Sequence, residues 1–249
     1  MNSSMTSRIG RPVNFLEFRL SKLNTPQFRH VKYALYWPVY VICFMAIEAL
    51  RPLSECHVMY CRLDDMIPFC EYFVFPYLFW YPFLILPLFY FFIFETDVFV
   101  RSMKFVMLTY TFAIVSFLIF PTCQMLRPDI LPRDNFFCDV VRFVYDVDTN
   151  TNVSPSIHVI GSFAVLFAAF DSKLFSTKGW KTFFTITAFI ICISTLFVKQ
   201  HSVIDVIDAV PICLLGYYLF YRKKAPASSE QRVCALPAGK FLYTAVYRK

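Results

Sequence analysis

The sequence predicts an all-α protein, built as a six-span transmembrane helical bundle. Charged residues make up 16% of the chain, well below the quarter that is usual in soluble domains. The apolar residues, 58% of the total, gather in long runs instead of alternating with polar ones. A bilayer core about 30 Å thick needs roughly 20 mostly apolar residues per helix. Runs of this length favour helices over a membrane β-barrel, whose strands alternate with a period of two.

Six apolar runs account for nearly the whole chain and predict one membrane domain. The expected domain covers residues 31–224, between a basic N-terminal arm at 1–30 and a basic tail at 225–249. We find no internal repeat that would divide it. The expected spans lie at about residues 31–50, 71–94, 100–121, 155–171, 182–198 and 201–221.

The distribution of basic residues predicts the orientation of these spans. Of the Lys and Arg residues, 18 fall on the side that carries both termini and six on the other side. Because cytoplasmic loops are enriched in Lys and Arg, we expect a multi-pass protein with both termini in the cytoplasm. The net charge of +7 is therefore interpreted as a topology signal, and no nucleic-acid partner is expected.

The nine cysteines do not form a metal-binding pattern, and we expect no metal or other cofactor. Five of them lie on or near the outer side, which is an oxidising environment in many membranes. The sequence leaves open one or two disulfides there without specifying their pairing. These five are Cys56, Cys61, Cys70, Cys123 and Cys138.

A polar cluster, "NVSPSIHV" at residues 152–159, precedes the fourth apolar run. Ser154 is a favoured N-cap residue and Pro155 suits the first helical position. A helix start of this kind presents free backbone N–H groups and the positive end of the helix dipole, which attract anions. Ser156 adds a hydroxyl donor, and His158 adds a group that titrates near neutral pH. The alternative interpretation is a capped helix whose histidine lies at the membrane interface.

A second cluster, "KQHSVIDVID" at residues 199–208, begins the sixth run. His201 and Asp205 are four residues apart, so they share one face of a helix. A carboxylate in this position fixes one imidazole nitrogen and leaves the other free to attack. The alternative is a purely structural pair. Asp208 is either a second orienting group or, as we favour, a polar contact to another helix.

The outer loop "LRPDILPRD" at residues 126–134 supplies further cations. Arg127 precedes a proline and is a candidate for bidentate binding of phosphate. Arg133 and Arg142 are interpreted as solvated loop charges. Lys199, two residues before His201, is either an anion ligand or an interfacial anchor. All of these segments are expected at one face of the membrane.

Taken in order, the three segments resemble the motifs of the type 2 phosphatidic acid phosphatase superfamily. The family patterns KxxxxxxRP, PSGH and SRxxxxxHxxxD correspond here to "FPTCQMLRP", "PSIH" and "STLFVKQHSVID". Their context looks most like the inositol phosphorylceramide synthase and sphingomyelin synthase branch. Three family positions differ, because Phe120 replaces the Lys, Ile157 the Gly and Thr195 the Arg. The resemblance covers the six-span region.

The resemblance implies a lipid phosphatase or phosphotransferase, with its active site at the extracytoplasmic face. In that mechanism His201 attacks phosphorus, Asp205 orients it, and His158 protonates the leaving oxygen and then activates the acceptor. Arg127 and Ser156 would hold the phosphate, and Lys199 would compensate for the missing cations. The implied substrates are phospholipids, sphingolipids or prenyl phosphates, and the acceptor is water or a lipid alcohol.

Two other classes compete with this hypothesis. Intramembrane Asp and His residues also serve as proton relays in transporters. A non-catalytic membrane scaffold with a relict phosphate site is the third class. The presence of His158, His201 and Asp205 together favours the enzyme.

Overall fold

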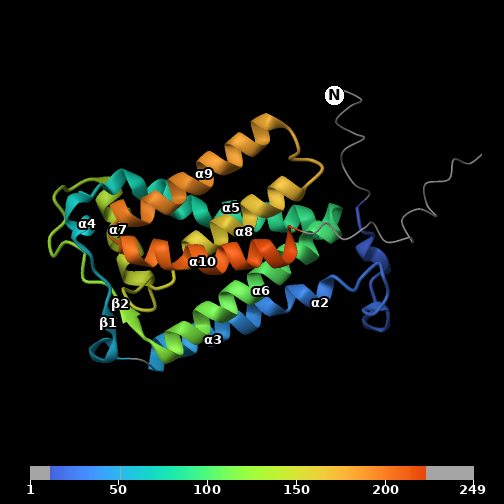
Figure 1. Ribbon diagram of the computed structural model, residues 1–249, viewed down its shortest axis with the longest axis horizontal. Helices are drawn as coiled ribbons and strands as arrows, with labels where there is room; N and C mark the ends of the chain where they lie inside the picture. Colours follow the sequence, from blue (N-terminus) through green and yellow to red (C-terminus); the bar gives the residue numbers. More distant parts are fainter. Residues whose placement is uncertain (1–11, 51, 223–249) are drawn as a thin grey trace, which may run out of the picture.

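The computed structural model of the chain describes residues 12–50 and 52–222. The predicted tail at 225–249 and the first 11 residues of the predicted N-terminal arm lie outside these described residues. Within them the fold is predominantly helical, as the apolar runs predict, and its two strands have two residues each. Long helices run side by side along the length of the molecule (Figure 1).

Five helical segments in the described part of the chain are long and apolar enough to cross a membrane. The first two each combine two helices, α2 (Val31–Ala34) with α3 (Tyr36–Leu50), and the 3-10 turn Glu71–Phe73 with α5 (Val74–Phe94). The others are α6 (Thr96–Ile119), α9 (Lys178–Phe197) and α10 (Val203–Phe220). These segments support the prediction of a helical membrane protein.

The segment expected as the fourth span is a shorter apolar helix, α8 (Ile157–Asp171), with 15 residues. It packs against α5, α6, α9 and α10, and lies at the centre of the bundle. Gly161, Ala164, Ala168 and Ala169 are buried in it, and small side chains of this kind let neighbouring helices approach closely. Helix α8 is therefore shielded from lipid by the surrounding helices over most of its length.

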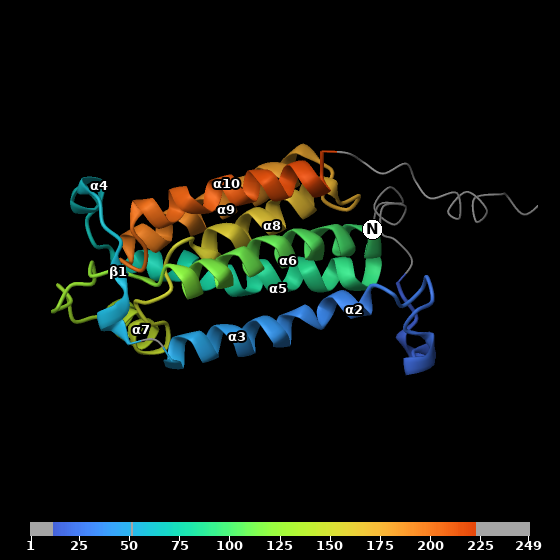
Figure 2. The same ribbon diagram turned by 60° about the horizontal axis from the view of Figure 1, so that its bottom comes forward.

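Helix α3, in contrast to α8, is mostly exposed on the surface of the bundle. Figure 2 shows α2 and α3 along one edge of the bundle, where their closest packing with another helix is against α6. Only Tyr40 and Ile47 of α3 are buried. The long helix of this edge therefore leaves most of its apolar surface open, as expected of a helix that faces lipid.

The loops gather into a cap at one end of the bundle (Figure 1). This cap contains α4 (Arg62–Met66), α7 (Phe136–Val147), the strands β1 (His57–Val58) and β2 (Thr122–Cys123), and a 3-10 turn at Leu53–Glu55. The two strands pair in parallel, and Thr151 bridges to Cys123 in the antiparallel sense. Three loops far apart in sequence are thus joined. The opposite end carries the 3-10 turns Phe15–Glu17 and Leu20–Lys22.

Candidate active site

The structure brings His158, His201 and Asp205 together at the end of the bundle that carries the loop cap. His201 lies in the turn between α9 and α10, and its Nδ1 is 3.3 Å from Oδ2 of Asp205. The rings of His158 and His201 have centroids 5.6 Å apart. The two histidines are only 4% and 6% exposed. We call this group the histidine site.

Asp205 is held in place by the local structure at the start of α10. Ser202 is the N-cap of this helix, and Asp205 closes a capping box with it. The backbone N–H of Ser202 donates to Asp205 Oδ2 at 2.8 Å, so the same carboxylate oxygen serves the backbone and His201. The backbone carbonyl of Asp205 accepts from the N–H of Ser156 at 3.1 Å. The starts of α8 and α10 are therefore fixed to each other.

The helix cap before His158 differs from the expected one. The N-cap of α8 is Ser156, whose hydroxyl accepts from the Val159 N–H at 3.5 Å, and the helix begins at Ile157. The expectation that Ser154 caps the helix was wrong, because its hydroxyl donates to Asp208 Oδ2 at 2.8 Å instead. Asp208 is accordingly a contact between the two helix starts. Ser156 contributes a helix cap beside the histidine site.

His158 is enclosed by aromatic rings. Its ring centroid is 4.5 Å from that of Tyr77 and 4.6 Å from that of Trp80, both on α5. A Cβ at Gly161 would lie 2.8 Å from the Trp80 ring and from the Tyr110 hydroxyl, so only glycine permits this packing. Within the described residues, neither ring nitrogen of His158 has a hydrogen-bond partner. Both nitrogens therefore remain available for proton transfer.

Arg127 is near the histidine site, but its donors are already engaged. Its guanidinium donates to Gln200 Oε1 at 3.1 Å and to the backbone carbonyls of Tyr145 at 3.0 Å and Asp148 at 2.5 Å. It also stacks on the Tyr145 ring at 4.4 Å. Burial lowers the pKa of this guanidinium, while Tyr145 and Asp148 oppose the shift. In this arrangement Arg127 positions Gln200 and the turn after α7.

Lys199 points away from the histidine site. Its ammonium donates to the backbone carbonyls of Asp64 at 2.8 Å and Ile67 at 2.5 Å. Burial lowers the pKa of this ammonium, and the nearby Asp64 and Asp65 act in the opposite direction. Lys199 thus joins the turn before His201 to the loop that carries α4.

Asp64, which sequence reasoning did not single out, is the centre of this connection. It is buried, and its carboxylate accepts from the Ser202 hydroxyl at 2.6 Å and from the Val203 N–H at 2.8 Å. The same carboxylate accepts from the Cys61 N–H at 2.8 Å. No local pattern reveals this role, since the partners are more than 130 residues apart. Asp64 fixes the start of α10 and, through it, the histidine pair.

A small cavity of about 20 Å³ lies against the two histidines. This cavity is small, but it has room for a water-sized polar group beside the histidines. Asn152, Asp148, Gln200 and Tyr77 also line it, and the Tyr77 hydroxyl donates to Asp148. The buried side-chain amide of Asn152 has no hydrogen-bond partner within the described chain. Asn152 is therefore a polar group that can serve a ligand, and it was missed in the sequence.

A much larger apolar groove of about 630 Å³ reaches the same histidine. We call it the aromatic groove. Trp37 and Tyr40 line it from α3, Tyr81 from α5, and Ile157 and His158 from α8. An apolar chain in this groove would therefore end beside His158.

The remaining polar residues singled out in the sequence lie outside this cluster. Arg133 forms an ion pair with Glu71 at 2.7 Å, and Arg142 pairs with Asp139. Thr195, at the position of the family's Arg, donates its hydroxyl to the Cys192 carbonyl. Four of the outer cysteines, Cys61, Cys70, Cys123 and Cys138, are thiols in the structure, and the thiol of the fifth, Cys56, donates to the Pro52 carbonyl.

The chain was also compared with known proteins. No family model matches it, and neither a curated protein nor a solved structure does.

Proposed function

We propose that this protein is a membrane enzyme that cleaves a phosphoester of an amphiphilic lipid through a phosphohistidine intermediate. The main support is the pairing of His201 with Asp205 at 3.3 Å, beside a second buried histidine with unengaged nitrogens. This is the arrangement of nucleophile, orienting carboxylate and proton donor that covalent phosphoryl transfer requires. The motif order and spacing, which resemble the type 2 phosphatidic acid phosphatase superfamily, give independent support.

In the first step Nε2 of His201 attacks phosphorus. A bond forms between nitrogen and phosphorus, and the bond between phosphorus and the leaving oxygen breaks. The Nδ1–H of His201 donates a hydrogen bond to Asp205. This fixes the tautomer in which Nε2 carries the lone pair that attacks. Protonated His158 transfers its proton to the leaving oxygen. The products of this step are phosphohistidine and the leaving group, which is a lipid alcohol or, from a prenyl diphosphate, a prenyl phosphate. When the substrate is a phosphodiester, its head group stays on the phosphohistidine.

In the second step His158, now neutral, takes the proton from the acceptor hydroxyl. The acceptor oxygen attacks phosphorus, and the nitrogen–phosphorus bond breaks to restore His201. Water as acceptor completes a hydrolysis, and a lipid alcohol completes a head-group transfer. The same two histidines therefore serve both reactions.

The phosphate oxygens require donors other than free cations. Arg127 and Lys199 hold backbone carbonyls, so the available donors are the first N–H groups of α8 and the Asn152 amide. A helix start and a buried amide are preorganised, so they stabilise the charge that builds up on phosphate without rearranging. Arg127, Ser156 and Lys199 act in this proposal mainly by fixing the walls of the site.

The aromatic groove supports a lipid as the substrate. It is apolar over most of its length and ends at His158, as an acyl or prenyl chain with a terminal phosphoester would need. Phospholipids, sphingolipids and prenyl phosphates all meet this requirement.

We further propose that α8 also crosses the membrane, as the fourth of six spans, and that the histidine site faces the extracytoplasmic side. Its 15 residues extend about 22 Å, and residues 152–156 would cover the remaining depth as irregular backbone. Such backbone is tolerated at membrane depth when protein surrounds it, and residues 152–156 are buried. Both termini would then lie in the cytoplasm.

The orientation can be tested with single added cysteines at exposed loop positions. Asp134→Cys lies in the loop cap and Lys178→Cys at the other end of the bundle. In sealed cells, an impermeant maleimide should add label to the first variant above the background of the parent chain, but not to the second. The reverse pattern would contradict the proposed orientation.

The function is tested by a product assay in liposomes. Phosphatidic acid, a prenyl diphosphate, and phosphatidylinositol with diacylglycerol or ceramide are supplied to the wild type and to His201→Ala. Free phosphate would indicate hydrolysis, and a new head group on the lipid alcohol would indicate transfer. Acid-labile, base-stable label on the protein, absent from His201→Ala, would identify phosphohistidine. Turnover that survives in His201→Ala would contradict the mechanism.

A further inference from the structure

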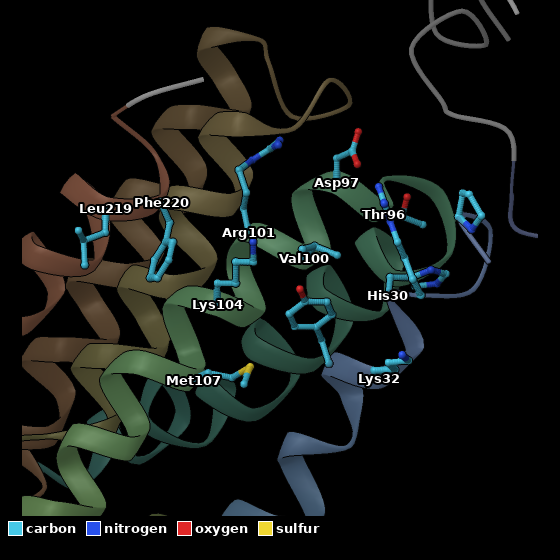
Figure 3. A pocket seen from close by; sticks show the side chains of 13 residues that line it. His30, Lys32, Thr96, Asp97, Val100, Arg101, Lys104, Met107, Leu219 and Phe220 are labelled. Atoms are coloured by element: carbon cyan, nitrogen blue, oxygen red, sulfur yellow. The ribbon is translucent and has the colours of Figure 1, made fainter. Parts of the chain in front are cut away.

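A second large pocket, of about 820 Å³, opens at the end of the bundle opposite the histidine site (Figure 3). Its walls come from the segment before α2, from α2 itself, from the first half of α6 and from the end of α10. We call it the basic pocket. Arg101, which lines it, forms an ion pair with Asp171, the last residue of α8. Since His158 is in the first turn of α8, about 20 Å of helix separates the two sites.

The charges around the basic pocket are strongly unbalanced. Its lining includes four cations, Arg29, Lys32, Arg101 and Lys104, and one carboxylate, Asp97. Arg101 is neutralised by Asp171. Among the ion pairs of the described residues, Arg29, Lys32 and Lys104 take part in none, and the Lys32 ammonium donates to Asn24. Three side chains of like charge therefore border one cavity, which favours a multiply charged anion as its occupant.

An apolar groove continues from the basic pocket along α6. It has a volume of about 690 Å³ and shares Tyr33, Lys104, Met107 and Phe220 with the pocket. Beyond these shared residues its lining is mostly apolar and includes Phe112 and Val115, both exposed on the surface of the helix. We call it the α6 groove. The basic pocket is thus continuous with the α6 groove, which runs along a helix long enough to cross a membrane.

We infer that the basic pocket and the α6 groove together bind an anionic phospholipid whose head group carries at least two negative charges. The phosphate groups contact Arg29, Lys32 and Lys104, and an acyl chain lies in the α6 groove. Basic pockets between transmembrane helices at the positively charged side of a membrane are suited to such head groups. This site is separate from the histidine site, and the inference does not depend on the proposed reaction.

The apolar groove distinguishes this inference from two simpler explanations. Basic residues at a helix end can merely anchor it by extending their charged groups to the membrane surface. Anchoring of that kind requires neither a cavity nor a groove beside it. A soluble anion would use the basic pocket but would leave the α6 groove unfilled. Only a ligand with both a charged and an apolar part fills the two together.

The test measures lipid binding to the full-length protein in neutral detergent. Native mass spectrometry follows titration with dioleoyl phosphatidylinositol 4,5-bisphosphate, with dioleoyl phosphatidylcholine as the lipid control. The His201→Ala background is used, so that turnover of the lipid cannot affect the measurement. The double variant Arg29→Gln/Lys104→Gln removes two of the three unpaired cations. Lys173→Gln/Lys178→Gln removes the same charge at exposed positions outside the pocket, at the same end of the bundle.

We expect the pocket variant to raise the Kd for the bisphosphate lipid by about tenfold or more, and the control variant by less than about twofold. Binding of phosphatidylcholine should be the same in all forms. The deacylated head group, glycerophosphoinositol bisphosphate, should bind at least about tenfold more weakly than the intact lipid. Equal affinity of the lipid for pocket and control variants would overturn the site. Head-group binding as tight as lipid binding would overturn the lipid assignment. An unchanged thermal midpoint in both variants shows that folding is not the cause.

Discussion

The two ends of this bundle use charge in opposite ways. At the histidine end, Asp64, Asp205 and Lys199 are buried. Asp64 and Lys199 are held by partners from distant segments, and one carboxylate oxygen of Asp205 is held by the nearby Ser202 N–H. At the basic end, Arg29, Lys32 and Lys104 line a wide pocket and form no ion pair within the described chain. Charges that are already satisfied fix geometry, and charges that are not can receive a ligand. The charged groups at the histidine end thus position other side chains, whereas the three cations at the basic end are available to an anion.

The largest effect is expected for the nucleophile at the histidine end. His201→Ala should lower turnover by about 10⁴-fold or more, because the attacking atom is lost. The matched control is His57→Ala, an exposed histidine of the loop cap that stacks on Phe120 at a centroid distance of 4.2 Å. It should retain turnover within about threefold. Equal losses in both variants would show that the loop cap, and not His201, carries the activity.

The next effect is expected for the orienting carboxylate. Asp205→Asn keeps an oxygen that can accept from Ser202, but it loses the charge that holds His201. We expect kcat to fall by about 10²- to 10⁴-fold with a stability change of only about 1 kcal/mol. Asp208→Asn, which retains an acceptor for Ser154, should change kcat by less than about twofold. Steady-state kinetics of the pair would contradict the assignment if Asp208 proved the more sensitive residue.

Arg127 tests whether a buried cation positions the wall or contacts the substrate. Arg127→Lys removes the planar donors that hold Gln200 and two backbone carbonyls, so we expect kcat to fall by about 10- to 100-fold with little change in KM. Arg142→Lys, on the exposed ion pair with Asp139, should be close to neutral. A large rise in KM with kcat unchanged would instead mean that Arg127 leaves its partners and binds phosphate.

The smallest expected effect concerns stability alone. Gly161→Ala places a Cβ against Trp80 and Tyr110 at 2.8 Å, and should lower the free energy of unfolding by about 1–3 kcal/mol. Gly179→Ala meets no atom within 4 Å and should be neutral or stabilise the protein by less than about 1 kcal/mol. The two variants are compared by their thermal unfolding midpoints in detergent. Equal midpoints would show that α8 can shift without cost, and that the packing around His158 is loose.

The sequence predicted the helical membrane fold and the pairing of His201 with Asp205, because both depend on local patterns. The meeting of His158 with His201 was expected because both segments were assigned to one face of the membrane and because their order resembles the family motifs. Long apolar runs define helices wherever they occur, and a spacing of four places His201 beside Asp205. The prediction was less accurate where partners come from distant segments. Ser154 has a good cap sequence, but Asp208 takes its hydroxyl, so the helix starts after Ser156.

The same limit explains the cations and the missed carboxylate. Arg127 was a candidate phosphate ligand, and Lys199 was expected to be either an anion ligand or an interfacial anchor. In the structure, both donate to backbone carbonyls of the loop cap. Asp64 lies in a loop with no motif, and its role depends on Ser202, which is 138 positions away in the sequence. Spacing along the chain carries no information on contacts of this range, so only the folded structure reveals them.

The carboxylate of Asp64 has a consequence for how the chain is made. It belongs to the loop between the first two membrane-crossing segments, yet two of its hydrogen-bond donors, Ser202 and Val203, lie at the start of the last helix. While only the first five apolar runs have been synthesised, Asp64 therefore lacks these two donors. Nascent chains that stop before His201 should be recognised as incomplete by membrane quality control, while synthesis of residues 201–203 supplies both the missing donors and the proposed nucleophile.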